Sequence, residues 1–320
     1  MQIERIILIS LIAIASILAI ILAISYLCYR IGFKRRDKSE GDPYTNTDKG
    51  NFKPFSEECR AKISKLCATE YEPVYISSHD GLKLFARYYH TKEGAPLEIM
   101  AHGYRSFSRR DFASVALLAL ERGHNLLLID QRSHGKSEGR SLSFGVLESE
   151  DIRSWVNYSV ERFGEDTKIT LMGISMGAAT VLLASALGLP HNVKCVIADC
   201  PFSSAKKLLP SIIERKKLSP KIMFPFLRLG GLIFGGFDIL KASPEEAVKY
   251  SDIPTLLIHG MGDKLVPSYM SEEIFENCKT EKKKLLLFPD ATHALSIFYD
   301  NERYVNEIIA FTEDALSKED

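Results

Sequence analysis

From residue 73 onward, short apolar runs alternate along the chain with longer stretches whose apolar residues recur at helical spacing. The short runs fit strands, and they cover residues 74–76, 82–89, 97–101, 125–129, 168–172, 194–198, 255–258 and 284–288. The longer stretches fit helices, and they cover residues 112–122, 147–163, 176–187, 268–277 and 301–316. This alternation predicts an α/β protein with a mostly parallel sheet covered by helices. The turn residues His79-Asp80-Gly81 predict an antiparallel hairpin at its start.

The first thirty residues have a different pattern. No charged residue lies between Ile6 and Leu27, and Ile, Leu and Ala dominate. As a helix rising about 1.5 Å per residue, this run spans roughly 33 Å, close to a hydrocarbon thickness of about 30 Å. A cleaved signal peptide or lipoprotein signal is the alternative, but the run exceeds a signal core and no small-x-small site follows it. We therefore expect residues 1–29 to form a transmembrane anchor.

The charges around this run predict its orientation. Only Arg5 precedes it, and the cations that follow it are Arg30, Lys34, Arg35, Arg36 and Lys38. Loops rich in Lys and Arg stay in the cytoplasm. We expect a single-pass protein of the cell membrane whose catalytic domain faces the cytoplasm.

Residues 30–54 are polar and rich in charge, Gly, Asn and Thr, which predicts a flexible juxtamembrane tether. The catalytic domain then covers residues 55–320. Between the strands at 194–198 and 255–258 the chain is much longer than one crossover helix, and it contains an apolar run at 222–237. We expect this insertion to be a lid, over about residues 203–250.

A second membrane-dipping element is the alternative explanation of that apolar run. Lys221, Arg228 and two Gly-Gly steps leave no uninterrupted stretch of spanning length. A peripheral hydrophobic lid therefore fits better than a second crossing.

Charge and cysteine content exclude some classes of function. Lys and Arg together number 41, as do Asp and Glu, so no broad positive field is available for nucleic acid. The six cysteines form no CxxC pair and lack nearby His ligands, which argues against a zinc site and a disulfide scaffold. A bridge between Cys59 and Cys67 stays open, although two cysteines two helical turns apart are usually too distant to bond. We expect no metal, and the oligomeric state is not determined by the sequence.

The segment Gly173-Ile174-Ser175-Met176-Gly177 lies between a predicted strand and a helix of small residues. This is the arrangement of a nucleophile elbow. A serine on so tight a turn has strained backbone geometry, and side chains two residues to either side would collide, which explains the glycines. The turn exposes the Ser175 hydroxyl at a helix N-terminus, where the helix dipole favours developing negative charge.

A serine nucleophile needs a general base and an acid that orients the base. Asp263 lies in the loop after the strand at 255–258, and His293 follows the last strand. The order Ser, Asp, His is the one found on a hydrolase sheet. We expect Ser175 to be the nucleophile, His293 the general base and Asp263 the acid. Two alternatives remain, since Asp263 can instead cap the next helix and Asp290 competes as the acid.

The oxyanion of an acyl-transfer reaction requires backbone donors. Tyr104 lies in the loop after the strand at 97–101, where the first donor is expected, and Met176 directly follows the nucleophile. The amides of Tyr104 and Met176 are therefore our candidates for the oxyanion hole. His102, His134 and His259 each adjoin a glycine at a strand end or turn, and we expect structural roles for them.

These motifs resemble those of the α/β-hydrolase superfamily, in particular its bacterial, membrane-anchored members classed with serine aminopeptidase-like and monoacylglycerol-lipase-like hydrolases. The matching segments are His102-Gly103-Tyr104, Asp130 to Ser137, Gly173 to Gly177, His259 to Pro267, and His293. The resemblance extends from Tyr71 onward, and Ser133 stands where the family commonly has Gly. It implies an eight-stranded sheet with helices on both faces, a lid after the sixth strand, and no cofactor.

The leading hypothesis is hydrolysis of a carboxylic ester or similar acyl compound through a Ser175 acyl-enzyme. Apolar lid residues and the membrane anchor favour a small or lipid-like hydrophobic acyl substrate. These lid residues are Ile222, Met223, Phe224, Phe226, Leu227, Ile233 and Phe234. They can equally pack on the lid's own core. A serine peptidase of the aminopeptidase-like group is one alternative, and a non-catalytic, membrane-tethered interaction domain is another.

Overall fold

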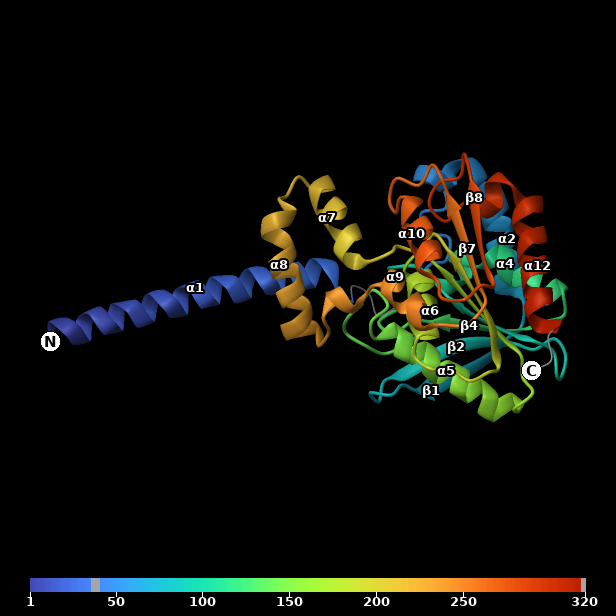
Figure 1. Cartoon of the computed structure of the whole chain (residues 1–320), viewed down its shortest axis with the longest axis horizontal. Helices are drawn as coiled ribbons and strands as arrows, with labels where there is room; N and C mark the ends of the chain where they lie inside the picture. Colours follow the sequence, from blue (N-terminus) through green and yellow to red (C-terminus); the bar gives the residue numbers. More distant parts are fainter. Residues whose placement is uncertain (36–40, 318–320) are drawn as a thin grey trace.

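The computed structural model describes residues 1–35 and 41–317, and the cations Arg36 and Lys38 and residues 36–40 of the predicted tether lie outside them. Eight strands form one sheet in the order β1-β2-β4-β3-β5-β6-β7-β8 (Figure 1). The strands are β1 (Glu72–Ser77), β2 (Lys83–Tyr89), β3 (Leu97–Ala101), β4 (Asn125–Asp130), β5 (Ile169–Ile174), β6 (Val193–Asp199), β7 (Thr255–Gly260) and β8 (Lys283–Phe288).

The sheet is parallel except at β2. This strand pairs antiparallel with β1 on one side and with β4 on the other, and every later pairing is parallel. The predicted α/β fold, the mostly parallel sheet and the hairpin at its start are therefore confirmed. Parallel strands end at the same edge of a sheet, so the loops after β3, β5, β6, β7 and β8 lie together.

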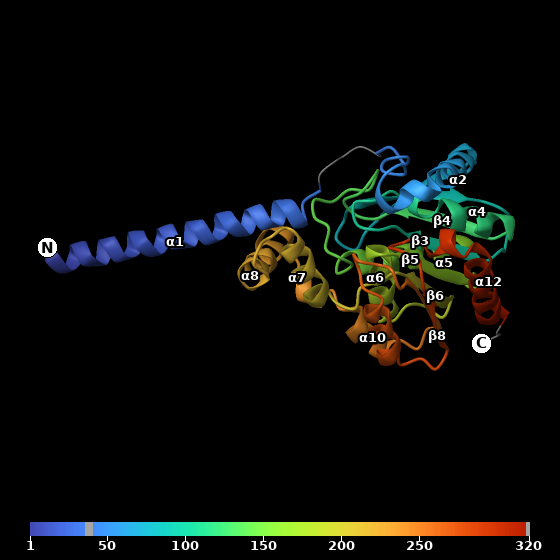
Figure 2. The ribbon, with the colours of Figure 1, turned by 90° about the horizontal axis from the view of Figure 1, so that it is seen from above.

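Helices pack on both faces of this sheet, as expected (Figures 1 and 2). Those of the catalytic domain are α2 (Ser56–Ala68), α3 (Ser108–Asp111), α4 (Ala113–Glu121), α5 (Glu148–Phe163), α6 (Met176–Ser185), α10 (Tyr269–Asn277), α11 (Ser296–Tyr299) and α12 (Asn301–Ser317). One core layer joins α2, α4 and α12 to the sheet. The other joins α5, α6 and α10 to its opposite face. Strand side chains contribute to both core layers, because successive side chains of a strand point to opposite faces of the sheet.

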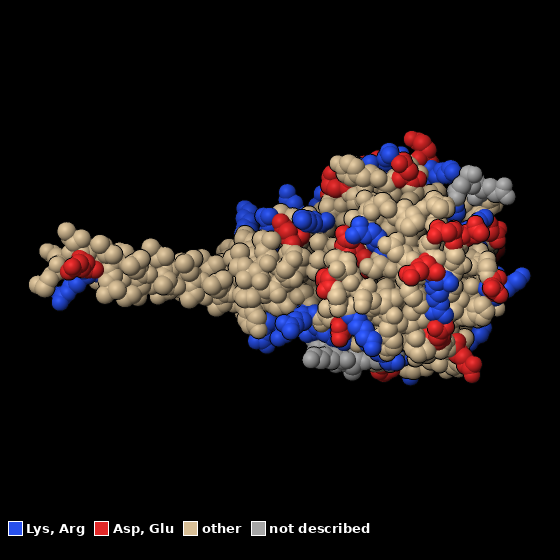
Figure 3. Space-filling view, turned by 90° about the horizontal axis from the view of Figure 1, so that it is seen from below, with Lys and Arg blue, Asp and Glu red and all other residues tan. Residues whose placement is uncertain are grey.

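The N-terminal helix α1 (Gln2–Gly32) extends beyond the predicted boundary at residue 29. An 18-residue window of this helix has a mean hydropathy of 3.2, and none of that window is buried. Figure 3 shows the helix as a rod that lacks charged side chains between its first turn and the globular part. Near its other end, Ser25, Cys28 and Tyr29 are buried.

The described part of the predicted tether is packed against the domain, which differs from the flexible segment expected there. Phe33 is fully buried, and Lys34 forms a β-bridge with Ser141. Residues 50–55 form the 3-10 helix η1 (Gly50–Phe55). The polar sequence of this segment does not suggest such packing. The packing depends on the buried Phe33 ring, on backbone hydrogen bonds and on the Arg35 guanidinium, which donates to the carbonyl oxygens of Gly135 and Ser137 at 2.6 Å.

The insertion between β6 and β7 is helical. It contains α7 (Ala205–Arg215), α8 (Pro220–Gly230), the π-helix η2 (Gly231–Gly235), η3 (Ile239–Lys241), α9 (Pro244–Ala247) and η4 (Val248–Tyr250). Helix α8 packs across α1 in both ribbon views (Figures 1 and 2). We refer to residues 203–250 as the lid.

A third hydrophobic cluster joins the end of α1, the lid and the catalytic domain. It includes Phe33 from the α1 end, Leu227 and Phe237 from the lid, and Phe144 and Phe202 from the domain. Met223, Phe224 and Phe226 are half-buried against it, whereas Ile222, Ile233 and Phe234 are exposed. Much of the lid's apolar character is therefore used to hold α1.

A buried carboxyl group lies at the end of β6. The Asp199 side chain accepts a hydrogen bond of 2.8 Å at Oδ2 from the Tyr304 hydroxyl of α12, and Asp199 is only 2% exposed. Burial raises the pKa of Asp199 from 3.8 to about 6, although the Tyr304 hydrogen bond acts in the opposite direction. The folded chain therefore retains this proton at pH values where the unfolded chain has lost it.

Replacing Asp199 with Asn should raise the free energy of unfolding above pH 6 and change it little at pH 4. Between these values the folded wild type binds more protons than the unfolded chain, so its stability falls as pH rises. Because the pKa of Asp199 is raised from 3.8 to about 6, the gain in the free energy of unfolding should be on the order of 3 kcal/mol. Asn keeps an acceptor for Tyr304. Denaturant titrations in detergent at several pH values measure the difference, with the exposed Asp290→Asn as control. A variant that is less stable than wild type at pH 8 would contradict this account.

Candidate active site

The turn between β5 and α6 holds Ser175 in a strained conformation. Its φ is 57° and its ψ is −116°, in a region that residues with a side chain rarely adopt. A Cβ on Gly173 would lie 2.2 Å from the Gly177 carbonyl oxygen, and one on Gly177 would lie 1.8 Å from that of Ala101. Neither position accepts a larger residue. The two glycines thus let α6 start directly against the end of β3, with the partly exposed Ser175 hydroxyl at its N-terminus.

The structure brings Ser175, His293 and Asp263 together, although 30 residues separate the last two in sequence. His293 Nε2 lies 2.9 Å from Ser175 Oγ, and His293 Nδ1 lies 2.6 Å from Asp263 Oδ2. The loops after β5, β7 and β8 supply one side chain each. The geometry suits proton transfer between the serine hydroxyl and the imidazole.

Asp263 is held in an environment that favours its ionised form. Burial alone would raise the pKa of this carboxyl, but hydrogen bonds with His259 and His293 and the charge of His293 hold it below its ordinary range. Its Oδ1 also accepts hydrogen bonds from the backbone amides of Leu265 and Val266, at 2.8 and 2.9 Å. Asp290, the competing acid of the sequence analysis, is exposed. Of the two candidate acids, Asp263 is therefore the one that is hydrogen-bonded to His293.

The loop after β3, residues 102–106, lies beside the elbow. A Cβ placed on Gly103 would lie 3.5 Å from the Ser175 Cβ, so the following residue, Tyr104, is close to the nucleophile. Met176 is the first residue of α6, where backbone amides have no intrahelical acceptor. Met176 thus directly follows Ser175, and Gly103, the residue before Tyr104, lies beside it. An oxyanion at Ser175 requires donors in this region.

Buried polar groups fix the 102–106 loop from the domain side. The Gly103 amide donates to Asp111 Oδ2 at 2.9 Å, and the Arg105 amide donates to His134 Nε2 at 3.1 Å. His102 accepts from the Gln131 amide at 3.2 Å. Burial lowers the pKa of His102 and His134, so both imidazoles are neutral and able to accept these bonds. The expectation of structural roles for these histidines agrees with their contacts.

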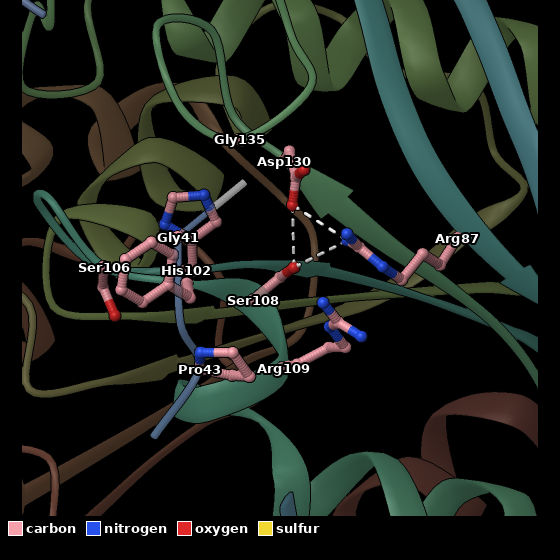
Figure 4. A pocket seen from close by; sticks show the side chains of 10 residues that line it. Gly41, Pro43, Arg87, His102, Ser106, Ser108, Arg109, Asp130 and Gly135 are labelled. Carbon is pink, nitrogen blue, oxygen red and sulfur yellow. Dashed lines mark hydrogen bonds and ion pairs between the residues drawn. The ribbon is translucent and has the colours of Figure 1, made fainter. Parts of the chain in front are cut away.

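Behind this loop, an ion pair lines a small cavity (Figure 4). Arg87 Nη1 lies 3.0 Å from Asp130 Oδ1, and the Ser108 hydroxyl donates to the same oxygen at 2.9 Å. His102 and Ser106 line the cavity beside them. Since Arg87 is only 1% exposed, removing one partner would leave a buried charge unpaired.

The turn at residues 130–137 explains the departure noted at Ser133. Ser133 has a φ of 65°, a left-handed conformation that favours Gly. Its hydroxyl donates to the Ser141 carbonyl oxygen at 2.8 Å. That bond helps the serine occupy a position where glycine is common.

Two groups of side chains in the described ranges have the composition of a metal site. One consists of Cys200, Asp263 and His293, and the hydrogen bonds above already engage its acid and its base. The other consists of His79, Asp80 and Asp151. Arg132 supplies the positive charge there, with bonds of 2.9 Å to Asp80 and 2.6 Å to Asp151. Neither group offers a free set of ligands.

Asp111 and the Asp199 carbonyl group contribute to this site and escaped sequence reasoning, whereas His134 and His259 were expected there only as structural residues. Asp111 and His134 hold the 102–106 loop without belonging to any catalytic pattern, and His259 lies 3.4 Å from Asp263. The Ser175 amide donates to the Asp199 carbonyl oxygen at 2.8 Å, which joins the elbow to β6. Only the adjacency of His134 and His259 to motif residues gave any signal for them.

Comparisons with known proteins agree with this geometry. A family model described as the alpha/beta hydrolase fold matches residues 99–218, and one described as serine hydrolase matches residues 170–295. The chain is 28% identical to the protein YqkD of Bacillus subtilis over 197 residues. This alignment covers 61% of this chain and 64% of that protein. It is 26% identical over 181 residues to an uncharacterized membrane protein of Saccharomyces cerevisiae, covering 56% of this chain and 57% of that protein.

Among solved structures, the chain is similar to the esterase Pf2001 of Pyrococcus furiosus. The two share 25% identity and a TM-score of 0.63 over 78% of this chain and 93% of that chain. The eight-stranded sheet, the elbow and these similarities support placing the chain in the α/β-hydrolase superfamily.

Proposed function

We propose that this protein is a serine hydrolase that cleaves carboxylic esters of hydrophobic acyl groups. The observation that carries the proposal is the unbroken line of hydrogen bonds from Asp263 through His293 to Ser175. The same constellation activates serine in unrelated hydrolases. One candidate oxyanion donor, Met176, directly follows Ser175, and Gly103, the residue before the other candidate, lies beside it.

The proposed reaction has two halves. Ser175 Oγ attacks the acyl carbon while His293 Nε2 takes its proton, and the amides of Tyr104 and Met176 stabilise the oxyanion. The intermediate collapses when the alcohol leaves with the proton from His293, and Ser175 retains the acyl group. Water then attacks the acyl carbon while His293 accepts its proton. The bond to Ser175 Oγ breaks, the carboxylic acid leaves, and His293 returns the proton to Ser175. Asp263 stays ionised throughout and stabilises the imidazolium.

Aromatic residues near the site favour a hydrophobic acyl group. The Tyr104 ring lies 5.1 Å from that of Phe144, whose ring lies 6.1 Å from that of Phe202. The similar Pyrococcus protein is named an esterase. A peptidase is the nearest enzymatic rival, and a comparison of p-nitrophenyl esters with aminoacyl p-nitroanilides distinguishes the two.

Replacing Ser175 with Ala should lower the rate of ester turnover by on the order of 10⁴-fold or more, because the nucleophile is lost while the fold keeps its contacts. The melting temperature should be unchanged. The assay uses the full chain in detergent with p-nitrophenyl esters of increasing acyl length, and Ser154→Ala, at a half-buried position of α5 like that of Ser175, is the matched control. Residual wild-type-like turnover would refute the assignment of Ser175. A wild-type chain that turns over neither esters nor amides would favour a non-catalytic interaction domain.

The acid can be tested by comparing two neighbouring aspartates. Asp263→Asn should lower kcat by on the order of 10⁴-fold, because the amide stabilises the wrong tautomer of His293. Asp290→Asn should have little effect, since Asp290 is exposed. Steady-state kinetics of both variants with one ester provide the comparison. A larger loss in the Asp290 variant would reassign the acid.

We also propose that α1 anchors the chain in a cell membrane as a single span. Its length and composition support this. The similar yeast protein is named a membrane protein. The cations Arg30, Lys34 and Arg35 closely follow the span in sequence, and they favour a cytoplasmic catalytic domain.

Protease added to intact cells should therefore leave the catalytic domain uncut, whereas lysed cells should allow its digestion. The chain should also stay with membranes after a high-salt wash, because a spanning helix is held by apolar transfer and not by screened charge. Immunoblots of both fractions measure these outcomes. Digestion from outside would reverse the orientation, and release by salt would exclude the span.

A further inference from the structure

The C-terminal end of α1 makes direct hydrogen bonds with the 102–106 loop. The Tyr104 hydroxyl donates to the Gly32 carbonyl oxygen at 2.6 Å. Arg105 Nη2 donates to the carbonyl oxygens of Ile31 and Lys34, at 2.9 and 3.2 Å. The last carbonyls of a helix have no intrahelical partner and carry partial negative charge, so a hydroxyl donor and a guanidinium suit this position.

Packing fixes the position of this helix end. The ring of Phe33 lies 5.9 Å from that of Phe144 and 5.1 Å from that of Phe237 in the lid. The Phe33 carbonyl oxygen also accepts from the Leu142 amide at 2.7 Å. On the opposite side, a Cβ on Gly230 would lie 2.4 Å from the Ser25 carbonyl oxygen, so α8 contacts α1 backbone to backbone.

The 102–106 loop needs support because one of its residues is strained. Arg105 has a φ of 51°, a left-handed conformation that a side chain disfavours. His134 holds its backbone from the domain side, and α1 holds its side chain. Such conformations persist only where the surrounding structure determines them. The amide of Tyr104, directly before Arg105, is the proposed oxyanion donor.

We infer that the end of α1 and the two residues after it, residues 31–34, position the 102–106 loop through Tyr104 and Arg105. This contact makes the anchor helix a part of the active site. This inference rests on the proposed esterase function. The side chains of Tyr104 and Arg105 act as positioning groups, because they touch α1 and set the direction of the Tyr104 amide. An oxyanion donor is effective only when it is aimed at the position the oxyanion will occupy.

The test uses the full chain in nanodiscs and the variant Tyr104→Phe, which loses the hydroxyl bonded to Gly32. Its kcat should fall roughly 10-fold with KM nearly unchanged, a smaller loss than the roughly 10²–10³-fold that follows complete removal of a donor. Affinity for a trifluoromethyl ketone, which forms a tetrahedral adduct, should fall by a similar factor, because that adduct uses the same donors. Arg105→Gln, a second variant, should behave likewise.

Tyr29→Phe is the matched control. It removes another tyrosine hydroxyl bond between α1 and the domain, the one of 2.8 Å to Ser141 Oγ, without touching the 102–106 loop. Its kcat and inhibitor affinity should stay at wild-type values. Equal losses in the Tyr29 and Tyr104 variants would overturn the inference, as would wild-type values for both loop variants. Either outcome would overturn only the inference about α1, because the loss of turnover in Ser175→Ala would still hold. A wild-type chain without ester turnover would instead reject the proposed function.

Discussion

The backbone of Ser175 is the constraint on which the rest of the site depends. A left-handed φ at a serine between strand and helix is possible only because Gly173 and Gly177 carry no side chains. That turn aims the hydroxyl out of the carboxyl edge of the sheet, where the loops after β7 and β8 end. A chain that relaxed this turn would lose the 2.9 Å approach to His293 Nε2. The parallel sheet thus serves as a rigid base for one strained residue.

Helix α1, the lid and the catalytic domain share one hydrophobic core. Phe33 joins rings from the domain and the lid in one buried cluster, and the carbonyls at the end of α1 bind the loop beside the nucleophile. A membrane span is usually connected to its domain by a linker whose composition sets its reach. Here α1 and the candidate site share contacts, so movement of α1 or of the lid would reach the 102–106 loop. The proposed preference for hydrophobic esters fits a site built next to an apolar helix.

The sequence was sufficient for the sheet, the elbow and the grouping of Ser175, Asp263 and His293, because each depends on local patterns: apolar runs, a Gly-x-Ser-x-Gly turn and residues at strand ends. It did not predict that α1 continues to Gly32 or that Phe33 is buried. Those features depend on partners more than 70 residues away, such as Tyr104. The Tyr304 bond to Asp199 is likewise invisible in sequence, since it joins residues 105 positions apart. Long-range polar contacts leave no periodic signal.

The most direct measurement of the central claim is the covalent adduct formed by a fluorophosphonate probe on the full chain. Only a serine activated by a base reacts rapidly with such a probe. Tandem mass spectrometry of the digested adduct should find the phosphonyl group on Ser175, with labelling lost when His293 is replaced by Ala. A wild-type chain that resists the probe, or an adduct on a different residue, would contradict the account.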